Sequence, residues 1–180
     1  MTSKSKIKKN PDRKLVLAAK QGDKHAAGRL VRRYQDRVLA LAYDYLGSYE
    51  EARDAAQEVF IKALSGLSGF TESSKFSTWI YRITVNHCLD ERRKKQRRKK
   101  LLERDLRDVA GLPDDSLETA GIDLERAGLS TAQRSALILR YYQDLSIPDI
   151  AAIMDCSENT VRTHIYRGIT KLRGKSQQRP

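Results

Sequence analysis

Residues 70–100 decide the fold, and they read FTESSKFSTWIYRITVNHCLDERRKKQRRKK. The first half is apolar at the spacing i, i+3, i+4 and i+7, and the side chains that share this helix face are Phe76, Trp79, Ile80 and Ile83. The second half is basic, with Arg or Lys at eight of the ten positions from 91 to 100. This pattern predicts one helix that is anchored in a core at its aromatic end and presents dense positive charge at the other.

The basic run has two interpretations. It can bind phosphate backbones, because each Lys or Arg that meets a phosphate releases condensed counterions, or it can be a solvated or disordered run. The whole chain has a net charge of +12 and a pI near 9.8, which favours a polyanionic partner, either nucleic acid or an anionic membrane surface. No apolar run approaches the roughly 18 residues that span a bilayer, so we expect no membrane insertion. The N-terminus lacks the apolar segment of a secretory signal, and we expect a cytoplasmic protein.

The rest of the chain predicts an all-α fold of two small helical domains. Apolar residues recur every three or four positions from 15 to 46, from 49 to 65 and again from 129 to 172. Between these parts, residues 101–125 are acidic and contain Gly and Pro, which is typical of a linker. We therefore expect a disordered basic tail (1–13), an N-terminal helical bundle (14–98), a flexible linker (99–125), a C-terminal helix-turn-helix domain (126–174) and a short tail (175–180).

The predicted helix over residues 49–65 has an acidic polar face in an otherwise basic protein. We expect its buried stripe to consist of Ala52, Ala56, Val59, Phe60, Ala63 and Leu64. The residues off this stripe are Asp54, Gln57, Glu58 and Ile61. Such a face repels DNA and suits contact with another protein, although a plain solvated face gives the same pattern. The loop that follows contains Phe70, which either packs into the core or is presented for stacking on a base.

The C-terminal part predicts a helix-turn-helix. Ser130, Ser146 and Ser157 stand where helix N-caps are expected, and Pro148 is tolerated in a first turn. In the last helix, the apolar residues that face inward are Val161, Ile165, Ile169 and Leu172. The side chains on the outward face are Asn159, Arg162, Thr163, Tyr166 and Arg167, which can all address base edges or phosphates in a major groove.

The sequence gives no sign of catalysis, of a metal site or of a cofactor. Cys88 and Cys156 stand alone, and the three histidines do not complete a metal-binding spacing. We find no Gly-rich phosphate loop and no nucleophile–base motif. We therefore expect a protein that is not an enzyme and that binds no cofactor.

Four stretches in the order found here resemble the bacterial sigma factors of the extracytoplasmic-function class, within the sigma-seventy family. They are GDKHAAGRLVRRYQDRVLALA, DAAQEVFIKAL, FSTWIYRITVNHCLDERRKK and the stretch 129–173, which contains LSIPDIAAIMDCSENTVRTHIYRGITKLR. The resemblance implies an N-terminal domain that binds core RNA polymerase and the minus-ten promoter element, and a C-terminal domain that binds the minus-thirty-five element. It also implies that the protein helps to melt the promoter.

The resemblance assigns roles to individual residues. The residues that it implies in minus-ten recognition and melting are Phe70, Trp79, Tyr81, Asn86, Arg92 and Arg93. Those that it implies in minus-thirty-five recognition are Asn159, Arg162, Thr163, His164, Tyr166 and Arg167. Those that it implies in contact with the polymerase are Asp54, Gln57, Glu58 and Ile61. Phe60 and Trp79 are interpreted mainly as core.

The resemblance implies three partners. The first is core RNA polymerase, whose clamp binds the N-terminal domain and whose flap binds the C-terminal domain. The others are promoter DNA, both as duplex and as non-template single strand, and an anti-sigma factor. The alternative is a dimeric helix-turn-helix regulator that never touches polymerase. That alternative leaves the stretches DAAQEVF and FSTWIYRITVN without a role.

Overall fold

The computed structural model describes residues 11–71, 74–106 and 128–176, and these residues contain helices and no strand. The all-α prediction is therefore confirmed. In chain order the elements are α1 (Arg13–Lys20), α2 (Lys24–Leu46), α3 (Tyr49–Ser65), η1 (Leu67–Gly69), α4 (Phe76–Leu106), α5 (Thr131–Leu137), η2 (Ile138–Tyr142), α6 (Ile147–Met154) and α7 (Glu158–Ser176). Most of the predicted N-terminal tail and of the predicted linker, and the last four residues, lie outside the described residues.

Local capping explains where the first long helices begin and end. The Asp23 carboxylate accepts hydrogen bonds from the backbone N–H groups of His25 and Ala26, and so caps the start of α2. Gly47 ends α2 in the left-handed region with a φ of 75°. Ser48 then caps α3 by accepting from the N–H of Glu51. The chain reverses here within two residues, which packs α2 and α3 against each other.

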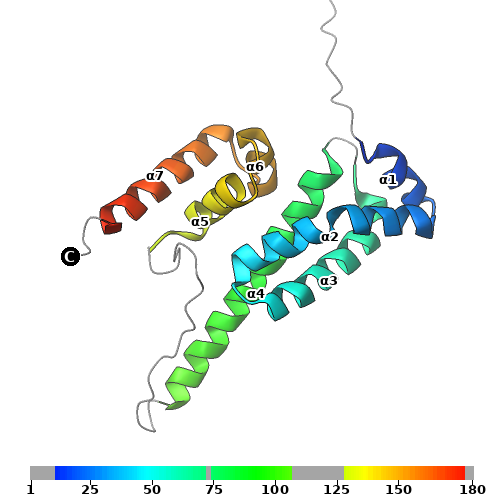
Figure 1. The fold of residues 1–180 in the computed structure, drawn as a ribbon. Coiled ribbons are helices and arrows are strands. Elements are labelled where there is room, and N and C mark those ends of the chain that lie inside the picture. Colours follow the sequence, from blue (N-terminus) through cyan, green and yellow to red (C-terminus); the bar gives the residue numbers. More distant parts are fainter. Residues whose placement is uncertain (1–10, 72–73, 107–127, 177–180) are drawn as a thin grey trace, which may run out of the picture.

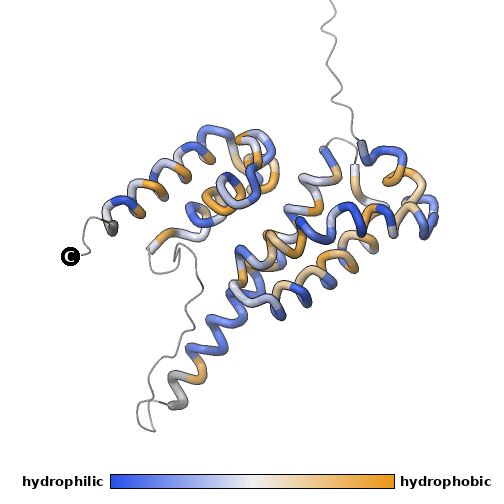
Figure 2. Tube along the Cα trace, viewed as in Figure 1, coloured by the Kyte–Doolittle hydropathy of each residue, from blue (hydrophilic) through white to orange (hydrophobic). Residues whose placement is uncertain are grey.

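The core of the N-terminal domain lies between α2, α3 and α4. Figure 1 shows α4 running through the whole domain, beside α2 and α3, and projecting beyond them at its C-terminal end. The projecting part is mostly hydrophilic, as Figure 2 shows. The helix passes residue 98, where we expected the domain to end, and continues to Leu106.

The buried face of α3 differs from our expectation at Ala55 and Leu64. Ala55 is buried, whereas Leu64 is 39% exposed and so does not belong to the stripe. The residues that α3 buries are Ala52, Ala55, Ala56, Val59 and Ala63. Because α3 contacts both α2 and α4, small alanines on two adjoining sides of its surface permit the close approach. Phe60 is partly buried against the core, as expected.

An aromatic cluster holds the start of α4 in the bundle. The Phe70 ring lies 5.9 Å from the Phe76 ring and 5.1 Å from the Trp79 ring, centroid to centroid. Tyr34 of α2 packs edge-on against Phe76 at 5.3 Å and against Tyr81 at 6.3 Å. Of the two alternatives for Phe70, packing into the core is the one found in this conformation, because the residue is only 3% exposed.

A buried acidic group ties α1 to α2. Asp12, which is 2% exposed, precedes α1, yet its side chain makes no capping bond to that helix. It instead accepts a hydrogen bond from the Tyr34 hydroxyl at 2.5 Å and pairs with the Arg33 guanidinium. Burial, followed by this hydrogen bond to Asp12, raises the pKa of Tyr34.

We expect Asp12→Ala to lower the free energy of unfolding by about 2 kcal/mol, because the Tyr34 hydroxyl loses its acceptor in a buried site. Arg33 is 42% exposed and regains water, so it adds little to the loss. Asp12→Asn keeps an acceptor and should lose less. Urea unfolding followed by circular dichroism measures both variants, and equal stability of Asp12→Ala and the native chain would contradict this role.

In the C-terminal domain, three of the predicted caps are confirmed. Ser130 forms a capping box with Gln133, Ser146 caps α6 through the N–H of Asp149, and Ser157 accepts from the N–H of Thr160 at the start of α7. α5 continues into the π-helical turn η2, which the periodicity does not predict and which closes with a bond from Gln143 N–H to Ile138 O.

The two helices that frame this domain, α5 and α7, approach closely at a glycine. A Cβ at Gly168 of α7 would lie 2.9 Å from the Leu137 Cδ1 atom of α5. The predicted inward residues of α7 lie against the core, with Val161 fully buried and Ile165, Ile169 and Leu172 partly buried.

The two domains pack against each other through α4 and α6, and through the end of α2 and η2. Figure 1 shows α5, α6 and α7 on the opposite side of α4 from α3. The polar contacts across the interface include those that join Lys75 to Asp149, Arg82 to Asp155, Gln143 to Asp44 and Arg134 to the Tyr45 carbonyl.

Candidate nucleic-acid interface and polymerase-binding face

One stripe of α4 combines the predicted DNA-contacting residues with two further cations. Asn86 and Arg93 are exposed and lie seven residues apart. Lys75, the residue directly before α4, and Arg82 lie on the same side, because the spacings from 75 to 82, 86 and 93 are close to whole helical turns. Lys75 and Arg82 were not among the predicted site residues. Their helical spacing from Asn86 was the available signal, but both lie among apolar residues whose pattern indicates a core.

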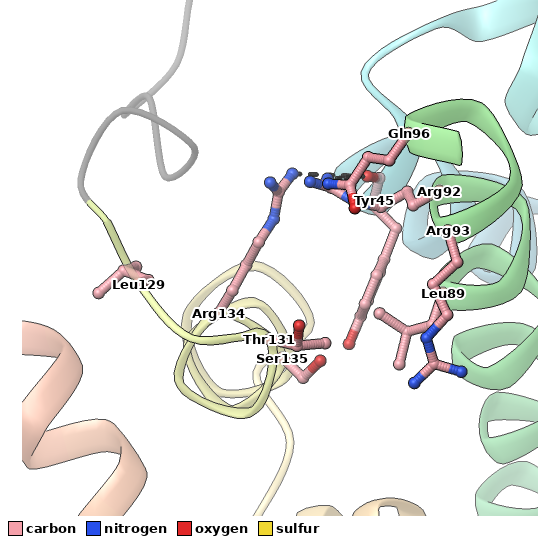
Figure 3. A pocket seen from close by; sticks show the side chains of 9 residues that line it. All are labelled: Tyr45, Leu89, Arg92, Arg93, Gln96, Leu129, Thr131, Arg134 and Ser135. Atoms are coloured by element: carbon pink, nitrogen blue, oxygen red, sulfur yellow. Dashed lines mark hydrogen bonds between the residues drawn. The ribbon is translucent and has the colours of Figure 1, made fainter. Parts of the chain in front are cut away.

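Arg92 has a structural partner that the sequence could not reveal. Its Nη1 donates to the carbonyl oxygen of Tyr45 at 2.8 Å, and Arg134 Nη2 donates to the same oxygen at 3.4 Å. This oxygen lies in the last turn of α2, where carbonyls lack helical donors and the helix dipole favours cations. Figure 3 shows the two guanidinium groups converging on Tyr45. In this conformation Arg92 is therefore a cap for α2.

Arg93 lies beside a cavity of about 290 Å³ between the domains. The lining side chains come from α2, α4, α5 and the segment before α5, and they are Tyr45, Leu89, Arg92, Arg93, Gln96, Leu129, Thr131, Arg134 and Ser135. Arg93 itself pairs with Asp90 at 3.1 Å in an exposed ion pair. Such pairs contribute little to stability, so this guanidinium can exchange the carboxylate for a phosphate.

The three aromatic residues predicted to act in minus-ten melting lie mainly in the core. Phe70 and Tyr81 are buried, and Trp79 is half-buried between Phe70 and Phe76. Lys20 Nζ donates to the Phe70 carbonyl at 2.5 Å, which fixes the loop backbone. In this conformation the α4 stripe therefore presents polar side chains, and none of the three aromatic rings is fully exposed.

His87 and Cys88 follow Asn86 but face the bundle. Lys62 Nζ lies 2.8 Å from His87 Nδ1. Burial, and then the positive charge of Lys62, lowers the pKa of His87 below its usual value of 6.5. Burial raises the pKa of the Cys88 thiol to about 12, so this thiol is not a reactive one. No group of three or more metal-ligating side chains occurs among the described residues.

The lowered pKa of His87 predicts a pH dependence of stability. The unfolded chain takes up a proton on His87 more readily than the folded chain, so the free energy of unfolding should fall as the pH drops below about 6.5. His87→Asn should flatten this part of the stability curve. Urea titrations between pH 7.5 and 5.5 measure the effect, and an unchanged curve for His87→Asn would contradict it.

The acidic face of α3 is open to a partner. Asp54 is 74% exposed and Ile61 61% exposed, while Gln57 and Glu58 between them are also exposed. The helix contacts α2 and α4 through its alanine stripe, so this outer face takes no part in the core. An exposed isoleucine among acidic and amide groups suits a protein surface better than a phosphate backbone.

The outward face of α7 presents the predicted recognition residues. Tyr166 is 73% exposed, and Arg162, Thr163 and Arg167 are exposed as well. Arg162 pairs with Glu158 at 2.9 Å and contacts Asn159 at 3.2 Å, while Thr163 Oγ1 donates to the Asn159 carbonyl. His164 is half-buried. Arg162 must therefore leave Glu158 before it can bind a base or a phosphate.

Comparison with known proteins agrees with this arrangement. The family model for sigma-70 region 2 matches residues 30–98, and that for sigma-70 region 4 matches residues 127–172. The ECF RNA polymerase sigma factor SigW of Bacillus subtilis (strain 168) is 34% identical over 177 residues, which cover 89% of this chain and 94% of that protein. The ECF RNA polymerase sigma-E factor of Escherichia coli (strain K12) is 33% identical over 186 residues, which cover 92% and 94%.

Among solved structures, CnrH in complex with the cytosolic domain of CnrY superimposes with a TM-score of 0.69 at 26% identity, over 94% of this chain and 99% of that one. The sigma factor RpoE of Bartonella quintana, solved with the anti-sigma factor NepR, shares the fold with a TM-score of 0.60 at 22% identity, over 85% and 98%. The chain therefore belongs to the sigma-70 family and is an RNA polymerase sigma factor of the extracytoplasmic-function class.

Proposed function

We propose that this chain binds core RNA polymerase through the outer face of α3 and directs it to promoters with two elements. The stripe of α4 reads and helps to melt the minus-ten element, and the outward face of α7 reads the minus-thirty-five element. The observation that carries the proposal is that one chain presents two separate polar, cation-bearing helix faces together with an exposed acidic one. Phosphates attract the first two and repel the third.

In this proposal the N-terminal domain spans residues 14–98, the C-terminal domain spans residues 126–174, and the chain contributes binding while the polymerase performs nucleotidyl transfer. The C-terminal domain contacts the polymerase flap. No helix among the described residues is long and apolar enough to cross a membrane. The proposed partners, polymerase and chromosomal DNA, place the activity in the cytoplasm.

A role of Phe70 and Tyr81 in melting requires a change of conformation, because both side chains are buried. A flipped base needs a pocket that repays a few kcal/mol of lost stacking, and Phe70 is buried in the free chain. We propose that Phe70 leaves the core when single-stranded DNA binds, while exposed Asn86 contacts the base. Trp79 stays mainly a core residue in this proposal.

We also propose an anti-sigma factor as a partner. CnrH, which has this fold, has been solved with the cytosolic domain of CnrY bound to it. The acidic face of α3 and the interdomain surface are the places where a protein inhibitor would compete with polymerase.

The test compares promoter binding with and without core polymerase. A labelled promoter fragment is incubated with the full chain, with core, and with both, and complexes are separated on a native gel. We expect a sequence-specific complex only when chain and core are both present. The family membership does not favour a dimeric helix-turn-helix regulator, and specific binding of a palindrome by the chain alone would overturn the proposal.

A further inference from the structure

Two ion pairs connect α6 and its C-cap residue Asp155 to Lys75 and Arg82, the cations at the start of the α4 stripe. Lys75 Nζ lies 2.9 Å from Asp149 Oδ1, and Arg82 Nη2 lies 2.8 Å from Asp155 Oδ2. Both cations are partly exposed, with 42% and 44% of their side-chain surface accessible. Ion pairs at this degree of exposure are weak and are screened by salt. The contacts are therefore reversible under conditions in which the domains stay folded.

The two cations are arranged as a phosphate backbone requires. Lys75, directly before α4, and Arg82 within it lie seven residues apart on one side of the helix, which corresponds to about 10 Å along its axis. In duplex DNA the phosphates of one strand recur at roughly 3.4 Å of helix axis, so two cations at this separation can reach phosphates about three steps apart. Asn86 and Arg93, on which the resemblance places minus-ten contacts, continue the same stripe. DNA that reaches Asn86 along this stripe also passes Arg82.

The observed packing of the domains conflicts with binding of a whole promoter. Elements centred about 25 base pairs apart, at roughly 3.4 Å each, are separated by about 85 Å along the duplex. Domains that contact each other through α4 and α6 do not span that distance. The C-terminal domain must therefore leave α4, and when it leaves, Lys75 and Arg82 lose their carboxylates at the moment when DNA phosphates become available.

We propose that Lys75 and Arg82 form a phosphate-binding pair for promoter DNA, and that Asp149 and Asp155 occupy this pair in the free chain in place of phosphates. The C-terminal domain thus acts as an intramolecular competitor of the minus-ten strand. The proposal rests on the proposed function, because it takes promoter DNA as the ligand of α4. It adds two DNA-contacting residues and assigns α6 a second role besides its place in the helix-turn-helix.

The backbone permits a substitution that removes only charge. Asp155 ends α6 in the left-handed region with a φ of 55°, and asparagine tolerates that region as well as aspartate does. Asp149 accepts a hydrogen bond from the Ser146 hydroxyl at 2.6 Å, and an amide oxygen can still accept it. The double variant Asp149→Asn, Asp155→Asn should therefore fold as the native chain does.

The control variant is Asp36→Asn, Asp144→Asn. It makes the same change in net charge at two exposed carboxylates, which form no ion pair with any residue described in the structure. Asp144 also has a positive φ, 48°, so the two double variants change the backbone preference alike. If a gain in DNA affinity depends only on net charge, it should be equal in the two double variants.

The first measurement is the affinity of the full chain, without polymerase, for a fluorescein-labelled single-stranded 12-mer of mixed sequence, by fluorescence anisotropy in 50 mM salt. We expect the Asp149→Asn, Asp155→Asn variant to bind about tenfold more tightly than the control variant. Equal affinities of the two variants, or no binding by either, would overturn the proposal.

The second measurement introduces Lys75→Gln and Arg82→Gln into the open Asp149→Asn, Asp155→Asn background. Two lost phosphate contacts should reduce the slope of log K against log salt by about 1.4, at roughly 0.7 per contact for single strands. An unchanged slope would show that these cations do not meet phosphates. Core-dependent transcription by the native chain is measured separately and tests the proposed function. If the native chain initiates normally but the variants do not differ in DNA binding, the ion-pair proposal is wrong and the proposed function still holds.

Discussion

Replacing Arg162 and Arg167 by alanine is expected to reduce transcription from promoters that depend on the upstream element by at least about 30-fold. Each lost base contact costs about 1–3 kcal/mol, and the two side chains lie on one exposed face of α7. The inward residues of this helix are untouched, so circular dichroism should show a native fold. Run-off transcription with core polymerase, on templates with intact and scrambled upstream elements, measures the effect.

Lys171→Ala is a charge control for this pair, because it removes one positive charge from the same helix, one turn beyond Arg167, where Lys171 Nζ donates to the Gly128 carbonyl. Its activity should stay close to native. If the double variant lost the same factor on every upstream sequence, Arg162 and Arg167 would contact phosphates and would not read bases. If it lost nothing, α7 would not be the recognition helix.

Replacing Asp54 and Gln57 together by alanine is expected to weaken binding to core polymerase by about 30-fold, the effect of losing about 2 kcal/mol at the centre of an interface. Both side chains are exposed on the outer face of α3 and contribute nothing to its buried alanine stripe. The stability of the chain should therefore stay unchanged. Competition against a labelled native chain for core polymerase measures the affinity.

Gln35→Ala with Asp36→Ala provides the control for this second variant, since it removes the same two residue types from an exposed position on α2. The control should bind core as the native chain does. Equal core affinity of the Asp54, Gln57 variant and the control would place the polymerase contact elsewhere on the molecule.

Much of the fold follows from local sequence signals. The caps at Ser130, Ser146 and Ser157, the α3 helix and the inward face of α7 depend on side-chain spacing within one or two turns, which a sequence displays directly. The π-helical turn η2 depends on how two neighbouring helices pack, and periodicity carries no sign of it. Leu64 was wrongly placed in the core because its apolar character fits the stripe, although α3 buries the alanine side instead.

The sequence named the candidate site residues, and these stay a prediction, but it did not indicate the contacts that they make in this conformation. Spacing identified the exposed faces of α3 and α7, and the resemblance added Asn86 and Arg93. Contacts between residues such as Lys75 and Asp149, 74 positions apart, leave no periodic pattern, so the packing of the two domains could not be foreseen. The same holds for Arg92, whose role as a cap for α2 depends on a carbonyl 47 positions away.

The central claim is that this chain gives core polymerase its promoter specificity. The most direct measurement is transcription in vitro with purified core polymerase and a genomic DNA library, with and without the chain, followed by mapping of the 5′ ends. The account predicts new, discrete start sites that share two upstream sequence elements. An unchanged set of transcripts, with a folded chain shown to be bound to core, would contradict it.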